Sequence, residues 1–170
     1  MDPLLAIARV LHIGLGAFWA GSVLFLAFVL DPSVRASGPA GGQVMGALAQ
    51  RGLTQILLTA GFIAIASGIY LFYVVSGGFT AEYSRSAPGI IYSLGLVASV
   101  VAWCIGFFVS RPTVARMGAL SASLAATSED QRGAITARMG ALRQRLTTAL
   151  MSVATLLSVV LASMALARYV

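Results

Sequence analysis

One histidine stands in an apolar run near the start of the chain, and its neighbours fall on one helical face. His12 is followed by Gly16, Trp19 and Val23 after four, seven and eleven residues, a spacing at which side chains share a face of an α-helix. An ionisable side chain inside a membrane is costly and is by default a functional candidate. Neutral imidazole ligates haem iron and copper, so we predict that His12 binds one of these.

Depth within the membrane restricts the partners that His12 can have. At about 1.5 Å of rise per residue, Met164 falls in the same leaflet as His12, within about 6 Å in depth. Thioether sulfur suits Cu(I), so we predict His12 and Met164 as a metal-ligand pair. Cys104 is the only cysteine; it falls toward the other leaflet, where we expect a small buried hydrophobe.

Each of these residues also has a structural interpretation. His12 can be a neutral ring bonded to a neighbouring carbonyl or hydroxyl, and Met164 can fill the core. Gly16 belongs to a set of small residues that either let helices approach closely or clear room for a flat cofactor. We predict the cofactor-binding residues to be His12, Gly16, Trp19 and Met164.

The composition indicates an integral membrane protein. Of 170 residues, 59% are hydrophobic and 9% are charged, whereas soluble domains carry roughly 25% charged residues. A soluble enzyme, a disordered protein and a nucleic-acid-binding domain are therefore excluded. Apolar runs of about 20 residues cross a bilayer as helices, and four such runs occupy residues 4–30, 53–76, 88–110 and 146–167. The first is too long for a signal peptide.

We therefore predict one all-α membrane domain over residues 1–170, a four-transmembrane-helix up-down bundle. Arginine predominates in the connections after the first and third runs, and basic loops stay in the cytoplasm. The prediction is a multi-pass protein of a bacterial inner membrane with both termini outside. Six aromatic residues near the outer boundary are expected to form an interfacial belt: Tyr70, Tyr73, Phe79, Tyr83, Tyr92 and Tyr169.

The third connection is expected to fold as a cytoplasmic helical hairpin over residues 112–145. Its first arm should end near Ala126, and a capping box from Ser128 to Gln131 should start a helix near Glu129 that continues into the fourth span. Apolar residues at three-four spacing predict a seam between the arms, formed by Met117, Leu120, Leu124, Ile135, Met139, Leu142 and Leu146. The outer arginines are candidate partner-binding residues: Arg116, Arg132, Arg138 and Arg145.

Prolines mark the ends of two spans at the same side of the membrane. We predict that Pro32 breaks the helix of the first span, whereas the helix of the third span should continue past Pro112. We also predict that Asp31 pairs with Arg35, Arg111 or Arg143. Between the first two spans a short surface helix is expected from Gln43 to Arg51, with Met45 and Leu48 turned toward lipid.

The opening of the chain resembles that of copper-resistance protein D (CopD)-like membrane proteins. The resemblance is carried by His12, Trp19 and Gly21, by Pro32, by Arg111-Pro112, and by the closing segment from Met164 to Tyr169. HemJ-type protoporphyrinogen oxidases have a similar opening with the same His and Trp. The resemblance implies copper handling or haem and redox chemistry. With a single histidine, a haem would need Met164, a second copy of His12, or a ligand from a partner.

The functional prediction is a CopD-like inner-membrane protein that handles copper or haem through His12. The alternative is a non-catalytic subunit that packs against a larger membrane complex, or a homo-oligomer. No hydrolase, kinase, Walker or dinucleotide motif is present in the sequence, which disfavours catalysis without a cofactor. The spans carry no charged residue at mid-membrane, which disfavours a proton-driven carrier.

Overall fold

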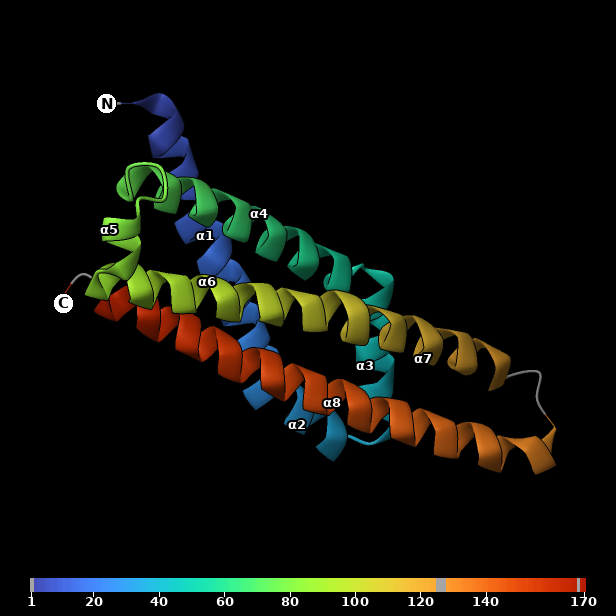
Figure 1. The fold of residues 1–170 in the computed structure, drawn as a ribbon. Helices are drawn as coiled ribbons and strands as arrows, with labels where there is room; N and C mark the ends of the chain where they lie inside the picture. Colours follow the sequence, from blue (N-terminus) through green and yellow to red (C-terminus); the bar gives the residue numbers. More distant parts are fainter. Residues whose placement is uncertain (1, 125–127, 168) are drawn as a thin grey trace.

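The computed structural model describes residues 2–124, 128–167 and 169–170, and every element in them is helical. Four helical stretches are long and apolar enough to cross a membrane: Pro3–Ala36, Leu53–Val75, Ala87–Ser123 and Asp130–Leu166. Figure 1 shows both termini and α5 (Ala81–Arg85) at one end and α2, α3 and α7 toward the other. These features support a multi-pass membrane protein.

Both the first and the third stretch continue through a proline. The prediction that Pro32 breaks the helix is therefore wrong, whereas the predicted continuation of the third helix past Pro112 is confirmed. The first stretch comprises α1 (Pro3–Phe25), a π-helical turn (η1, Leu26–Leu30) and α2 (Asp31–Ala36). The third comprises α6 (Ala87–Ile105), a second π-helical turn (η2, Gly106–Ser110) and α7 (Arg111–Ser123).

The π-turns explain how the helices pass the prolines. A proline lacks the N–H and its ring collides with the carbonyl four residues earlier. In each π-turn the residue before the proline donates its N–H five residues back, from Asp31 to Leu26 and from Arg111 to Gly106. The wider turn lets the helix continue without a normal bond at the proline.

The same short sequence pattern overlaps both π-turns. Phe-Val lies within each turn and Pro-Ser/Thr-Val follows the turn, at residues 28–34 and 108–114. The hydroxyls of Ser33 and Thr113 donate to the carbonyls of Val29 and Val109 at 2.7 and 2.6 Å. The first and third helical stretches thus share the same local structure, a π-turn followed by a proline, toward the same end of the molecule.

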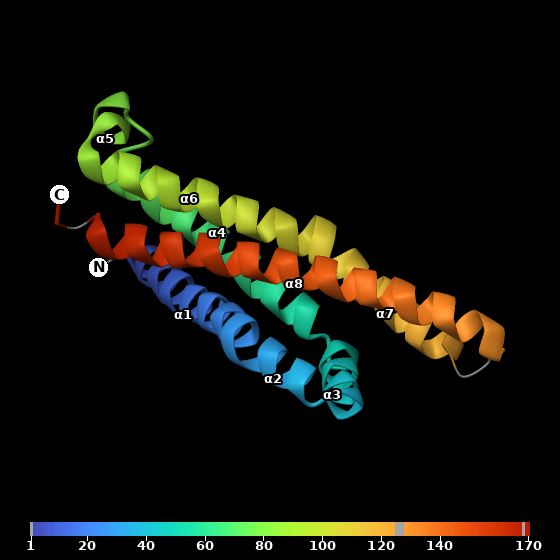
Figure 2. The same ribbon diagram turned by 90° about the horizontal axis from the view of Figure 1, so that it is seen from below.

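The long helices associate as two close pairs, α1 with α4 (Leu53–Val75) and α6 with α8 (Glu129–Leu166). Figure 2 shows α6 beside α8, with α4 passing behind α8 in this view. Small residues allow this proximity: Gly61 lies against the Trp19 ring and Gly95 against Ser163. A shared core joins the pairs and includes Trp19, Ala27, Ala102, Ala154 and Leu157.

The helix α8 is 38 residues long and begins at Glu129, as predicted. Ser128 is its N-cap, but the capping box is not formed, because the Ser128 side chain caps nothing and the Gln131 N–H bonds to the Ser128 carbonyl. The first arm is helical to Ser123; its predicted end near Ala126 lies outside the described residues.

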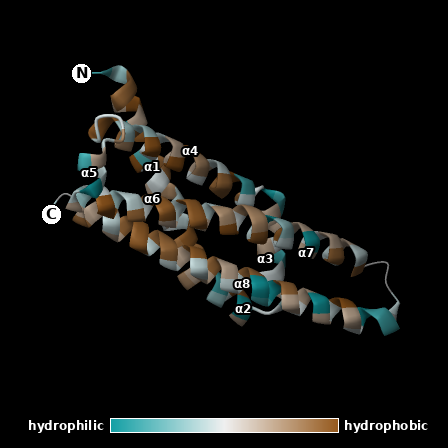
Figure 3. Ribbon diagram, in the orientation of Figure 1, coloured by the Kyte–Doolittle hydropathy of each residue, from teal (hydrophilic) through white to brown (hydrophobic). Residues whose placement is uncertain are grey.

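α7 packs against α8, and the pattern of burial along them matches the predicted seam. All seven seam residues, from Met117 to Leu146, are partly buried, whereas Arg116, Arg132, Arg138 and Arg145 are exposed. Figure 3 shows hydrophilic colour on the parts of α7 and α8 that extend past the other helices. The remaining lengths of the long helices are mostly hydrophobic in colour.

Leu142→Asp should release this arm pair, because it places a charge in the seam. We expect faster protease cleavage between residues 112 and 145 with the rest of the protein intact. The matched control is Gln144→Asp, at an exposed neighbouring position, which should leave the cleavage rate unchanged. Equal cleavage of the two variants would show that the seam does not hold the arms together.

The connection after α2 differs from the prediction in its bounds and in its contacts. α3 spans Pro39–Gln50, so it begins four residues before Gln43, with Pro39 in its first turn, where a missing N–H costs nothing. Met45 and Leu48 are partly buried, and Met45 lines an internal cavity. The predicted orientation of Met45 toward lipid is therefore wrong, because α3 folds back onto the protein; the orientation of Leu48 stays a prediction.

Asp31 selects one of its three predicted partners. Its carboxylate lies 2.7 Å from the Arg35 guanidinium. Thr147 on α8 accepts a hydrogen bond from Arg35 and donates one to Asp31 at 3.4 Å. The ion pair therefore joins α2 to α8, while Arg111 lies over the Phe107 ring at 5.2 Å from its centroid.

Candidate ligand cavities

A cavity of about 540 Å³ lies between the two helix pairs, toward the end that carries the termini. All four residues predicted to bind a cofactor line it: His12, Gly16, Trp19 and Met164. The first three come from one face of α1, and Met164 comes from α8. Most of the remaining lining is apolar, as in typical small-molecule sites of 300–1,000 Å³. We call this the outer cavity.

His12 is held by a specific hydrogen bond across the first helix pair. Its Nδ1 lies 2.8 Å from the carbonyl oxygen of Ala64 on α4. A carbonyl only accepts, so Nδ1 donates this bond, and the Nε2 lone pair is the one that a neutral imidazole in this position can offer to a ligand. This carbonyl contact is the one expected of a structural histidine, and it is also how metal-binding histidines are oriented.

Gly68 provides the space that the imidazole occupies. A Cβ at this position would lie 2.7 Å from Cε1 and 2.9 Å from Nδ1 of His12. Because Gly68 follows Ala64 by one helical turn, one face of α4 supplies both the acceptor and the room for the ring. Hydropathy and spacing gave no indication of this pairing, which joins residues 52 positions apart.

Sulfur ligands are sparse around His12. Met164 is partly buried beside Gly95, where an added Cβ would lie 3.4 Å from the methionine Cε. Cys104 is partly buried and lines neither of the cavities described in this section. Within the described residues, no group of three or more His, Cys, Asp or Glu side chains is placed to hold a metal ion.

Three further polar residues line the outer cavity without having been predicted as site residues: Arg9, Tyr92 and Ser99. The Ser99 hydroxyl is satisfied by the Leu96 carbonyl at 2.8 Å. Arg9 precedes His12 by three residues and so shares its helix face, a signal that was available in the sequence. The cavity therefore combines one imidazole and one cation with extensive apolar walls.

Several aromatic residues at the end that carries the termini form a cluster around Phe72, and their predicted role as an interfacial belt stays a prediction. Phe72 lies 5.8 Å from Phe79, 6.1 Å from Tyr83 and 6.4 Å from Tyr92, measured between ring centroids. Burial raises the pKa of Tyr83, in α5, and the neighbouring Tyr92 adds to the rise. The rings of this cluster surround Phe72, which itself lines the outer cavity.

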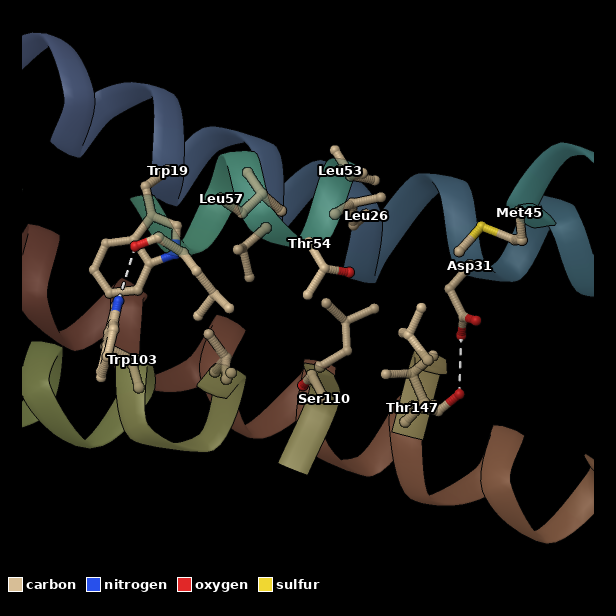
Figure 4. A pocket seen from close by; sticks show the side chains of 18 residues that line it. Trp19, Leu26, Asp31, Met45, Leu53, Thr54, Leu57, Trp103, Ser110 and Thr147 are labelled. Carbon is tan, nitrogen blue, oxygen red and sulfur yellow. Dashed lines mark hydrogen bonds between the residues drawn. The ribbon is translucent and has the colours of Figure 1, made fainter. Parts of the chain in front are cut away.

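A second cavity of about 140 Å³ lies on the other side of Trp19, and we call it the inner cavity. Figure 4 shows Trp19 and Trp103 at one end, Asp31 and Thr147 at the other, and Thr54 and Ser110 between them. The Trp103 indole donates to the Leu58 carbonyl at 2.8 Å. Residues of both π-turns contribute to the wall, so the two repeated segments border one space.

The predicted partner-binding arginines lie away from both cavities. Arg116, Arg132, Arg138 and Arg145 are exposed on α7 and α8, and their role in binding a partner stays a prediction.

Comparison of the chain with protein-family models, with curated proteins and with solved structures found no match in any of the three.

Proposed function

We propose that this chain is a multi-pass inner-membrane protein that binds haem in the outer cavity, with Nε2 of His12 as an axial ligand. The observation that carries the proposal is the 2.8 Å contact from His12 Nδ1 to the Ala64 carbonyl at the wall of that cavity. The contact leaves Nε2 as the nitrogen free to ligate, and it fixes the orientation of the ring. Haem would supply the iron and its redox chemistry.

The residues around His12 fit haem better than they fit a copper ion. A flat apolar macrocycle needs a large apolar cavity, and the outer cavity measures about 540 Å³. A stable copper site needs several convergent donors, whereas the side chains described here offer His12 and Met164 and no cluster of three ligands. Gly16 has open space beside it, which favours its role in admitting a ring. Trp19 would form the floor.

Arg9 supports the same assignment from its position on α1. It lines the outer cavity one turn from His12 and nearer to the membrane surface. An exposed guanidinium there suits carboxylates such as the haem propionates. We also propose that both termini and Arg9 lie outside, because basic segments stay in the cytoplasm. The end opposite the termini carries most of the arginines: Arg35, Arg51, Arg111, Arg116, Arg132, Arg138, Arg143 and Arg145.

The experiment is an absorption spectrum of the gently solubilised protein, oxidised and then reduced with dithionite. We expect a Soret band with α and β bands on reduction, and we expect His12→Ala to abolish them while the protein still accumulates. Met164→Leu, which keeps the volume of the side chain, should retain haem with shifted bands if its sulfur is the second ligand. A featureless spectrum, with copper in elemental analysis, would replace haem by copper; neither chromophore nor metal would overturn the proposal.

The second candidate function is that of an accessory subunit in a larger membrane complex, or of a homo-oligomer. It is favoured by the exposed arginine face of α7 and α8, which extends past the other helices (Figure 1). Such a subunit should co-purify with partners in mild detergent, and charge reversal of Arg132 and Arg138 together should release them. A single monodisperse monomer at native expression would exclude this role.

A further inference from the structure

We propose that the inner cavity is a separate binding site for the ring of a quinone-type molecule, held through its two carbonyl oxygens. The proposal does not depend on haem in the outer cavity. It rests on the hydrogen-bonding groups that face the inner cavity without a partner among the described residues, on their spacing, and on the shape and position of the cavity.

The first of these groups is the Trp19 indole. Trp19 is 6% exposed and lines the inner cavity. Within the described part of the chain, no acceptor takes a hydrogen bond from its N–H, whereas the Trp103 N–H is bonded to Leu58. Buried tryptophans usually find an acceptor. No fully enclosed side-chain nitrogen or oxygen lacks a partner among the described residues, so the Trp19 N–H must border open space.

Two hydroxyls behave in the same way. Most Ser and Thr hydroxyls on the long helices donate to a carbonyl three or four residues earlier; Ser67, Ser93, Ser99, Thr113, Thr155, Ser158 and Ser163 all do so. Thr54 and Ser110 are partly buried and make no such bond among the residues described. Both line the inner cavity, and Figure 4 shows them between Trp19 and Asp31.

The spacing of these donors fits a ring with oxygens at opposite ends. Trp19 lies against Gly61, and Thr54 precedes Gly61 by seven residues on the same helix, which is about 10 Å along the axis. Ser110 follows Trp103 by the same number of residues along α6 and η2. The para oxygens of a six-membered ring lie roughly 5 Å apart, and a hydrogen bond of about 2.8 Å extends from each. The total is close to the separation of about 10 Å along the helix axis.

The walls favour a neutral aromatic ligand over an ion. Leu57, Ala102 and Leu150 supply apolar surface, and the Trp103 ring stands at the same end as Trp19. The nearest charges, Asp31 and Arg35, are paired with each other at 2.7 Å. A cavity of about 140 Å³ is close to the size of engineered apolar cavities that admit benzene.

The test is a titration of the purified full-length protein in lipid nanodiscs with decylubiquinone. The chain has two tryptophans. Both line the inner cavity, but Trp19 also lines the outer one, so quenching of Trp103 fluorescence in the Trp19→Phe variant reports occupancy of the inner cavity. We expect saturable quenching. The double variant Thr54→Val/Ser110→Ala should weaken the apparent Kd about tenfold, and Trp19→Phe about fivefold, as the net value of one lost hydrogen bond implies.

Matched controls separate this site from lipid and from the outer cavity. Thr155→Val removes a hydroxyl from the same bundle that bonds its own helix and should leave the Kd unchanged. His12→Ala should abolish haem but not quinone binding, so the two proposals fail independently. Quenching that stays linear with concentration, competition by decanol as strong as by the quinone, or an unchanged Kd in both Trp19→Phe and the double variant would each overturn the proposal.

Discussion

Gly68→Ala should deprive the protein of bound haem while the four long helices stay folded. The added Cβ would lie 2.7 Å from Cε1 and 2.9 Å from Nδ1 of His12, closer than non-bonded atoms approach. The imidazole must then move, and it loses its contact with the Ala64 carbonyl at 2.8 Å. A ligand displaced by even about 1 Å loses its productive geometry. We expect haem occupancy to fall about tenfold to a hundredfold, which is the usual effect of losing the hydrogen bond that orients a metal-binding histidine.

The measurement is the ratio of Soret to protein absorbance after purification with excess haem. Gly14→Ala is the matched control, because a Cβ at Gly14 meets nothing within 4 Å and Gly14 does not line the outer cavity. It should bind haem like the original chain. Full occupancy in Gly68→Ala would show that the observed position of His12 is not the one that binds the cofactor.

Gly61→Ala should destabilise the membrane-spanning core by overpacking it at Trp19. Its Cβ would lie 2.8 Å from Cε2 and 2.9 Å from Cδ2 of Trp19. Trp19 is 6% exposed and belongs to the core that joins the two helix pairs, so the rigid ring has nowhere to retreat except toward the cavities. Overpacking of this kind costs about 1–3 kcal/mol.

The loss should appear as a lower midpoint of thermal unfolding in detergent, followed by the circular dichroism of the helices. Gly21→Ala on α1 is the control, since a Cβ there has open space around it. It should leave the midpoint unchanged or raise it, because alanine is the better helix former by about 0.5–1 kcal/mol. If Gly61→Ala unfolds no earlier than Gly21→Ala, the close approach of α1 and α4 at Trp19 is not what holds the pair together.

Two features could not be predicted from the local sequence, because the same residue types occur in two different structural settings. Proline most often ends a helix, yet Pro32 lies inside a continuous one, where a π-turn removes the collision. Met45 and Leu48 have the pattern of a membrane-surface helix, but α3 packs back onto the bundle beside Gly41, which lies directly against the Val34 carbonyl. In both cases contacts with neighbouring residues, and not the intrinsic helix propensity of the residue, determine the local structure.

The four apolar helices, the start of α8 at Glu129 and the apolar seam along α7 and α8 could be predicted from the amino-acid sequence, because hydropathy and helical periodicity act locally along the chain. Three relations appear only in the folded molecule: His12 meets Ala64 and Gly68, Met164 lines the same cavity, and Trp19 lies between two cavities with an N–H that bonds to no described residue. Those relations depend on the rotation and depth of each helix against its neighbours. Small residues and backbone carbonyls set that rotation and depth, and hydropathy does not record them.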